Sequence, residues 1–107
     1  MTKATRNPNR CPTHPGRVLG EIVLPALDVS KAKLAGHLGI SRQTLYDLLG
    51  EKQPVTPRMA VRLAKLVGNN PRIWLNMQGA HDLWHASRDI DVSAIPTLKA
   101  AGKPQSG

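Results

Sequence analysis

The sequence predicts an all-α domain, and two features of the chain carry this prediction. Leucine and alanine dominate its apolar residues, while phenylalanine is absent and only one tyrosine and two tryptophans occur. Leucine and alanine lose little rotamer freedom in a helix, whereas strands favour aromatic and β-branched residues. Apolar residues also recur at spacings of three and four between capping residues and glycines, which is the pattern of helices with one buried face. With 107 residues, the chain is expected to form one domain.

The first helix is expected to begin at His14-Pro15, because proline is pre-shaped for a first helical turn. Pro25 should end this helix or bend it, because its ring clashes with the preceding turn. Leu27 is expected to reach the core from the connection that follows. The apolar face of this helix is predicted to consist of Val18, Leu19, Ile22 and Val23.

Two short helices joined by a tight turn are expected between Ser30 and Leu49. Ser30 and Ser41 stand where N-caps belong, and Gly39 can end the first of the two helices with a positive φ. The small side chain of Ala35 should let the two helices cross closely. Their buried faces are predicted to contain Leu34, Ala35 and Leu38 on the first helix, and Leu45, Leu48 and Leu49 on the second.

Two further helices are each expected to begin with a capping residue followed by proline. Thr56-Pro57 should open a helix that ends near Val67, before Gly68, and Asn70-Pro71 should open one that runs to about Ser87. The inner face of the fourth helix is predicted to contain Ala60, Leu63, Ala64 and Val67, and its outer face Arg58, Arg62 and Lys65.

The fifth helix carries apolar residues on more than one side, which predicts burial against both the domain and a partner. Gly79 in its interior costs up to about 1 kcal/mol relative to alanine, which favours the close approach of another helix. A two-fold dimer contact is expected here, with Trp74 equally compatible with the core. The predicted dimer interface consists of Trp74, Met77, Gly79, Leu83 and Trp84.

The two ends of the chain are predicted to flank a single domain at residues 14–90. Residues 1–13 are polar, basic and proline-containing, and residues 91–107 are rich in turn and linker residues, so both are expected to be flexible. Cys11 has no cysteine to pair with, which favours a reducing compartment. No apolar run approaches the roughly 20 residues of a membrane span, and no signal peptide is visible, so a cytoplasmic protein without membrane contact is expected.

The formal net charge of +8 favours a polyanionic partner such as DNA. Residues 1–14 contribute +3 and residues 92–107 contribute +2, which leaves +3 for the middle, where ten basic residues face seven acidic ones. A basic surface that serves only solubility remains the alternative explanation.

The pair of helices between Ser30 and Leu49 has the pattern of a helix-turn-helix, whose second helix enters the major groove. Arg42, Gln43 and Thr44 are expected at base edges, and Ser41 and Tyr46 at phosphates. The alternative is an ordinary solvent-exposed polar helix. Lys52 and Arg58, which lie in and after the following loop, complete the basic residues expected at the DNA, while Asp47 would repel phosphate unless it accepts from cytosine or braces Arg42.

Several stretches resemble the HigA-type antitoxins of bacterial toxin–antitoxin modules, within the Xre/Cro-like class. They are His14-Pro-Gly-Arg, the helix pair, Asp82-Leu-Trp and, most specifically, the Pro-x-x-Trp-Leu-x-x-Gln run at Pro71–Gln78. The resemblance covers about residues 12–90 and implies a five-helix, lambda-repressor-like fold. It also implies a dimeric repressor that binds an inverted-repeat operator in its own promoter and neutralises a RelE/HigB-like mRNA-cleaving toxin. Lys31 stands where such proteins commonly have a glutamine that contacts phosphate.

Two other functions remain open from the sequence: a helix-turn-helix regulator without a toxin, and a helical adaptor with only minor DNA contact. No metal or cofactor is expected. His81 and His85 lie one helical turn apart and resemble a zinc-binding pair, but only the remote His14 and His37 accompany them. No catalytic set of side chains stands out, so the sequence predicts that the protein is not an enzyme.

Overall fold

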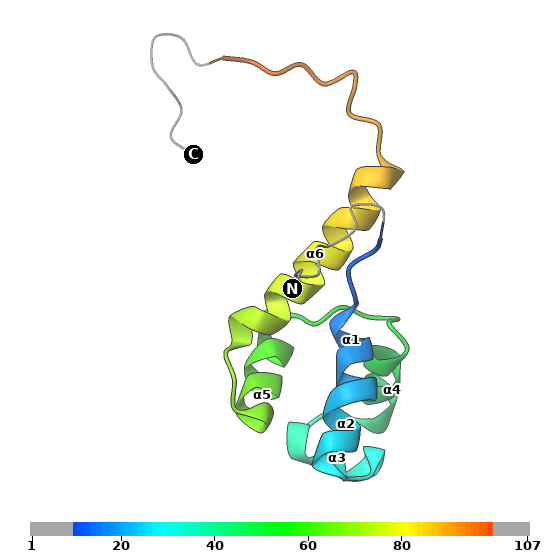
Figure 1. Cartoon of the computed structure of the whole chain (residues 1–107), viewed down its shortest axis with the longest axis vertical. Coiled ribbons are helices and arrows are strands. Elements are labelled where there is room, and N and C mark those ends of the chain that lie inside the picture. Colours follow the sequence, from blue (N-terminus) through cyan, green and yellow to red (C-terminus); the bar gives the residue numbers. More distant parts are fainter. Residues whose placement is uncertain (1–9, 100–107) are drawn as a thin grey trace, which may run out of the picture.

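The chain folds into helices, seen in a computed structural model that describes residues 10–99 (Figure 1). No strand occurs within this range, and none of the described helices is both long and apolar enough to cross a membrane. The first three elements follow one another without a gap, so the predicted all-α, five-helix fold is confirmed. The elements are α1 (Pro15–Val18), the π-helical turn η1 (Leu19–Val23), α2 (Leu24–Leu27), α3 (Lys31–Leu38), α4 (Arg42–Leu49), α5 (Pro57–Val67) and α6 (Pro71–Asp89).

The first helix passes through the proline that was expected to end or bend it. Pro25 lies in the first turn of α2, directly after η1, and the helix continues to Leu27. The backbone N–H of Leu24 donates to the carbonyl of Leu19, which is the wider hydrogen bond of a π turn. A wider turn gives the proline ring room against the preceding carbonyls. The expected end at Pro25 is therefore wrong.

The π turn also changes which side chains of this helix are buried. One extra residue in a turn rotates the following side chains by about 100° around the helix axis. Leu19 and Val23 are buried as expected, but Ile22 is 62% exposed. Leu27 is 39% exposed, because it lies at the solvent end of α2, so its expected place in the core is also wrong.

The helix boundaries that depend on caps agree with the sequence. The hydroxyl of Ser30 accepts the N–H of Lys33 at 3.1 Å, and that of Ser41 accepts the N–H of Thr44 at 3.0 Å. Thr56 and Asn70 cap α5 and α6 in the same way. Gly39 ends α3 with a φ of 72°, a conformation that strains any residue with a Cβ.

One aliphatic core joins these elements, and Trp74 is its only aromatic residue among the described residues. Val67 was expected on the inner face of α5 but is 38% exposed, because it lies at the end of that helix next to Gly68. The core consists of Leu19, Val23, Leu34, Ala35, Leu38, Leu45, Leu48, Val55, Ala60, Leu63, Ala64 and Trp74.

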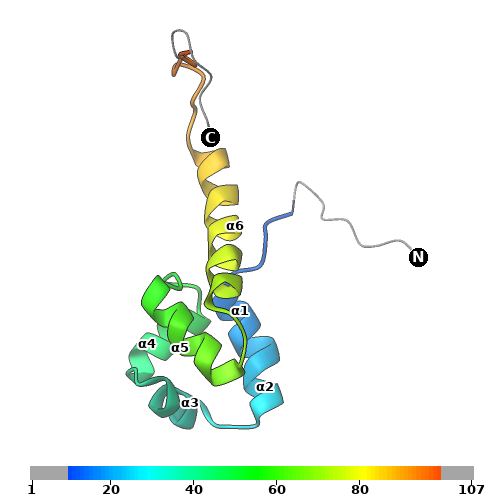
Figure 2. The ribbon, with the colours of Figure 1, turned by 90° about the vertical axis from the view of Figure 1, so that its left-hand side faces the viewer.

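The first helix and α4 approach each other so closely that only glycine fits between them. A Cβ on Gly16 would collide with the carbonyl oxygen of Leu48. The first helix therefore lies directly against the backbone of α4. In contrast, the second half of α6 extends away from the other helices, as both views show (Figures 1 and 2).

Candidate nucleic-acid interface

Helix α4 is held by its apolar side and presents its polar side to solvent. Leu45 and Leu48 are completely buried, whereas Arg42 and Gln43 are exposed and Tyr46 is 46% exposed. Arg42 and Gln43 lie in the first turn of the helix, which is the part that contacts base edges in a helix-turn-helix. The geometry therefore agrees with the division between holding and reading residues that the sequence predicts.

Gln43 is oriented by the acidic residue that the sequence left without a role. The side-chain nitrogen of Gln43 donates to a carboxylate oxygen of Asp47 at 2.9 Å, one helical turn away. The two possibilities considered for Asp47, a bond to cytosine or a brace for Arg42, both overlooked this contact. The spacing of four residues is the signal that could have revealed it, because such residues are neighbours on a helix surface. The side-chain oxygen of Gln43 has no hydrogen bond to the described residues.

Ser41 and Thr44 form a closed pair at the start of α4. The Ser41 hydroxyl accepts the backbone N–H of Thr44 and donates to the Thr44 hydroxyl oxygen at 2.9 Å. The Ser41 proton is thus already used within the protein. Any contact of these two hydroxyls with DNA must fit around the cap, which keeps the first turn of α4 in place.

The other basic residues predicted at DNA come from three segments outside α4. The ammonium of Lys31, at the start of α3, is 5.9 Å from the centre of the Tyr46 ring, close to the limit for a cation–π contact. Lys52 is exposed in the loop after α4, and its backbone N–H donates to the carbonyl of Asp47 at 2.8 Å. Arg58 is exposed in the first turn of α5. The structure thus places Lys31 and Lys52 next to α4 and leaves Arg58 exposed on the neighbouring helix α5.

Arg62 differs from the other members of the basic face predicted on α5. One of its guanidinium nitrogens donates to the carbonyl of Leu38 at 2.8 Å. That carbonyl is at the C-terminal end of α3, where helix carbonyls lack a partner and a positive charge is favoured. Arg62 therefore fixes the turn between α3 and α4, while it stays exposed on the outer face that the sequence predicts for it.

The Pro-x-x-Trp-Leu-x-x-Gln run at Pro71–Gln78 holds the loop that carries Lys52. The buried side chain of Gln78 accepts the N–H of Val55 at 2.7 Å and donates to Asp82 at 2.9 Å. The indole N–H of Trp74 donates to Asn69 at 3.1 Å. The motif thus positions the interface from behind and does not form part of it.

The residues predicted at a dimer contact divide into two groups. Trp74 is 1% exposed in the core, so its assignment to the interface is wrong. Met77 and Trp84 are half-buried and Leu83 is 66% exposed. No atom lies within 4 Å of a Cβ placed on Gly79, apart from its own helix backbone and chain neighbours, so no helix of the same chain explains this glycine.

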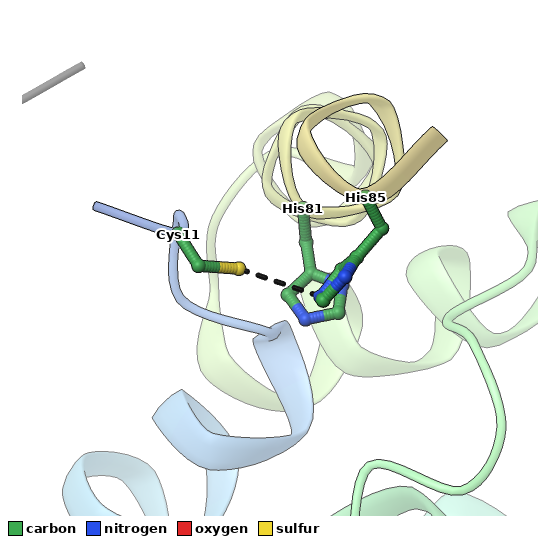
Figure 3. Close-up of side chains that lie close together, drawn as sticks. All are labelled: Cys11, His81 and His85. Atoms are coloured by element: carbon green, nitrogen blue, oxygen red, sulfur yellow. Dashed lines mark hydrogen bonds between the residues drawn. The ribbon is translucent and has the colours of Figure 1, made fainter. Parts of the chain in front are cut away.

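The segment before α1 lies against α6 instead of standing free. Cys11 and Pro12 are half-buried, and the Cys11 sulfur is 3.5 Å from Nε2 of His85 (Figure 3). Burial, followed by the charge of His81, lowers the pKa of the adjacent His14 below its ordinary value. Residues 1–9 and 100–107, most of the two predicted tails, lie outside the described part of the chain.

Taken together, a capped helix with exposed polar residues, a bracing helix before it and a fixed turn between them define a helix-turn-helix DNA-binding domain. Known proteins extend this assignment, although no family model matches the chain. It is 37% identical over 84 residues to the uncharacterized HTH-type transcriptional regulator YddM of Escherichia coli K12, covering 78% of this chain and 88% of that protein.

Two similarities to antitoxins refine the assignment. The chain is 34% identical over 79 residues to antitoxin HigA-1 of Vibrio cholerae O1, covering 74% of each protein. Its structure is similar to that of the antitoxin GraA in complex with its operator, with a TM-score of 0.76, 31% identity, and coverage of 94% of this chain and 99% of that one. The chain belongs to the HigA-type helix-turn-helix antitoxins, as the sequence resemblance predicted.

Proposed function

We propose that this protein binds an inverted-repeat operator in its own promoter as a dimer, represses that operon and neutralises a RelE/HigB-like toxin that cleaves mRNA. The observation that carries the DNA-binding part is the arrangement of α4, where Asp47 orients the exposed Gln43 at 2.9 Å. An amide held in this way can bond an adenine edge without losing much side-chain freedom on binding. The relative GraA is in complex with its operator, which supports the same role here.

In this proposal the basic residues around α4 have separate roles. Arg42, Gln43 and Thr44 contact bases, while Lys31 and Tyr46 contact phosphates and fix the register. The remaining predicted phosphate contacts are Ser41, Lys52 and Arg58.

The DNA-binding part is tested with the promoter DNA upstream of the gene. Fluorescence anisotropy with a labelled promoter fragment should give specific binding that persists in an excess of unrelated DNA. Selection from random DNA should return an inverted repeat whose half-sites lie about 34 Å apart. Binding that unrelated DNA removes completely would favour the alternative of a helical adaptor with minor DNA contact.

The dimer is proposed to form through the half of α6 that its own chain leaves open. Leu83 is 66% exposed, and Gly79 offers room for a second helix. Trp84, half-buried on the same half of α6, adds a large apolar ring. A second copy of the chain would cover these apolar residues.

Sedimentation at several protein concentrations tests this contact. Leu83→Glu should convert a dimer into a monomer, because it places a charge in an apolar contact. Ile22→Glu is the matched control, since Ile22 is 62% exposed on the first helix, away from α6. A wild-type chain that stays monomeric, or a Leu83→Glu variant that stays dimeric, would contradict the proposed interface.

The toxin is proposed from the relationship to antitoxin HigA-1, and it is expected to be a small basic protein encoded beside this one. Co-expression should restore the growth of cells that produce that neighbour, and the two proteins should purify together. A plain regulator without a toxin is the competing function, favoured by the relationship to YddM. The absence of a toxic neighbour would decide for it. We assign the protein no enzymatic activity and place it with the DNA, in the cytoplasm of a bacterial cell.

A further inference from the structure

Three metal-binding side chains meet where the N-terminal segment crosses α6. Cys11, His81 and His85 lie side by side, and one ligand atom of each is within 4.8 Å of the other two (Figure 3). The two histidines are one turn apart on the same face of α6. Cys11 lies 74 residues before His85, so residue spacing along the chain could not identify it as a third ligand.

The distances suit a zinc ion. Bonds of about 2.3 Å to sulfur and about 2.05 Å to nitrogen place a sulfur and a nitrogen ligand about 3.5 Å apart in a tetrahedral site. The Cys11 sulfur and Nε2 of His85 are 3.5 Å apart. The other separations are at most 4.8 Å, so side-chain rotations that move ligand atoms by about 1 Å would bring all three to zinc-bonding distance.

The surroundings provide support behind the ligands. A carboxylate oxygen of Asp82 is 3.5 Å from Nδ1 of His81, and such a carboxylate orients a metal-binding imidazole. The buried His14 ring packs edge-on against His81 with centroids 4.9 Å apart. Nδ1 of His14 accepts the N–H of Gly16 at 2.8 Å, so that nitrogen is occupied and His14 supports the site from behind.

The surroundings of the three ligands leave space for an ion and do not carry a prohibitive positive charge. The site opens into a hollow of about 270 Å³, which accommodates an ion and a water molecule. Two arginines, Arg10 and Arg17, line this hollow, and the guanidinium of Arg17 is paired with Glu21 at 3.0 Å. Glu51 in the lining and the thiolate of Cys11 offset positive charge when a cation binds.

We propose that Cys11, His81 and His85 bind a zinc ion, with water at the fourth position. One thiolate and two imidazoles form a donor set that zinc prefers. The Cys11 thiol releases its proton to solvent when the Zn–S bond forms. The bound ion ties the segment before α1 to α6, the helix proposed to form the dimer, and so orders both parts of the chain.

Metal titration of the full-length protein, freed of any histidine tag and of metal, tests this proposal. Calorimetry with Zn²⁺ should give one ion per chain, and Co²⁺ should produce the near-ultraviolet absorption of a thiolate–cobalt bond. Cys11→Ser and His85→Ala should each weaken zinc binding by about a hundredfold or more, because loss of a ligand exceeds the 10- to 100-fold cost of losing an outer partner. His37→Ala, an exposed histidine on α3, should bind as the wild type does.

The Cys11→Ser variant distinguishes a three-ligand zinc site from weak binding by the two histidines alone. It is conservative in size, and its thermal unfolding without metal should match that of the wild type, so lost binding cannot reflect lost folding. Zinc binding by Cys11→Ser at wild-type affinity, a stoichiometry well below one, or cobalt absorption without the thiolate band would each overturn the proposal. DNA binding is not needed for this test, so its outcome is independent of the proposed function.

Discussion

Helix α4 buries most of its apolar side chains, whereas α6 leaves several of its own exposed. In α4 the apolar side chains Leu45 and Leu48 are completely buried and the polar ones face solvent. In α6 a polar side chain, Gln78, is 5% exposed, whereas Ile73 and Leu83 are 47% and 66% exposed. A helix completed by its own chain is ready to bind a polar ligand, while one with uncovered apolar residues favours a protein partner. The difference is the reason for proposing that α4 contacts DNA and that α6 contacts a protein.

The largest expected effect is a difference in the free energy of unfolding between two leucine variants, one in each helix. Leu48→Ala should lower the free energy of unfolding by about 2 to 5 kcal/mol, because it leaves a cavity in the core. Leu83→Ala should change it by about 0.5 kcal/mol or less when measured in dilute, monomeric protein. Urea unfolding measures both values. Equal losses would mean that α6 is buried within the monomer and would remove the contrast.

Gln78→Ala should have the next largest effect on stability, because Gln78 joins α6 to the loop that follows α4. It leaves the buried N–H of Val55 without its acceptor, which costs about 1 to 3 kcal/mol of stability. Hydrogen exchange of the Val55 amide should become faster in this variant. Gln53→Ala is the control, because the Gln53 side chain makes only a 3.4 Å contact with the carbonyl of Thr44.

The reading role of α4 predicts two graded effects on DNA specificity. Gln43→Ala should reduce discrimination at one operator base by about 1 to 3 kcal/mol. Asp47→Ala should relax the same base by a smaller amount, because it removes only the bond that orients Gln43. Asp47→Asn retains an acceptor and should behave nearly as the wild type. Selection from random DNA checks all three, and an unchanged preference for Gln43→Ala would refute its contact with a base.

Lys31→Ala should have the smallest effect and the least dependence on sequence. Loss of one phosphate contact weakens binding to all DNA similarly and reduces the salt slope by about 1. Anisotropy titrations at several salt concentrations, with operator and unrelated DNA, measure that slope. A loss confined to the operator would identify Lys31 as a residue that recognises bases.

The features that the sequence predicted well are those decided by neighbouring residues. The caps at Ser30 and Ser41, the glycine at Gly39 and the burial of Leu45 each follow from a few adjacent positions. Local chemistry alone decides such features, because a cap bonds an N–H only two or three residues away.

The features that could not be predicted from the sequence depend on contacts between distant segments, or on two local preferences that oppose each other. Arg62 bonds a carbonyl 24 residues away, and Cys11 contacts a histidine 74 residues away. No periodicity encodes such distances. The π turn before Pro25 settles a conflict between a proline and a helix that the core favours, and this turn moves Ile22 to the surface.

The amide of Gln78 sets a chemical requirement that few side chains satisfy. Its position needs one acceptor for Val55 and one donor for Asp82 on the same short group. Glutamate lacks the donor and would place a second carboxylate beside Asp82, while lysine lacks the acceptor. Asparagine carries the right atoms on a side chain one methylene shorter. Glutamine therefore suits position 78 better than these three residues do. The same contact can be sought in other sequences as a tryptophan, a glutamine four residues later and an acidic residue four residues after that.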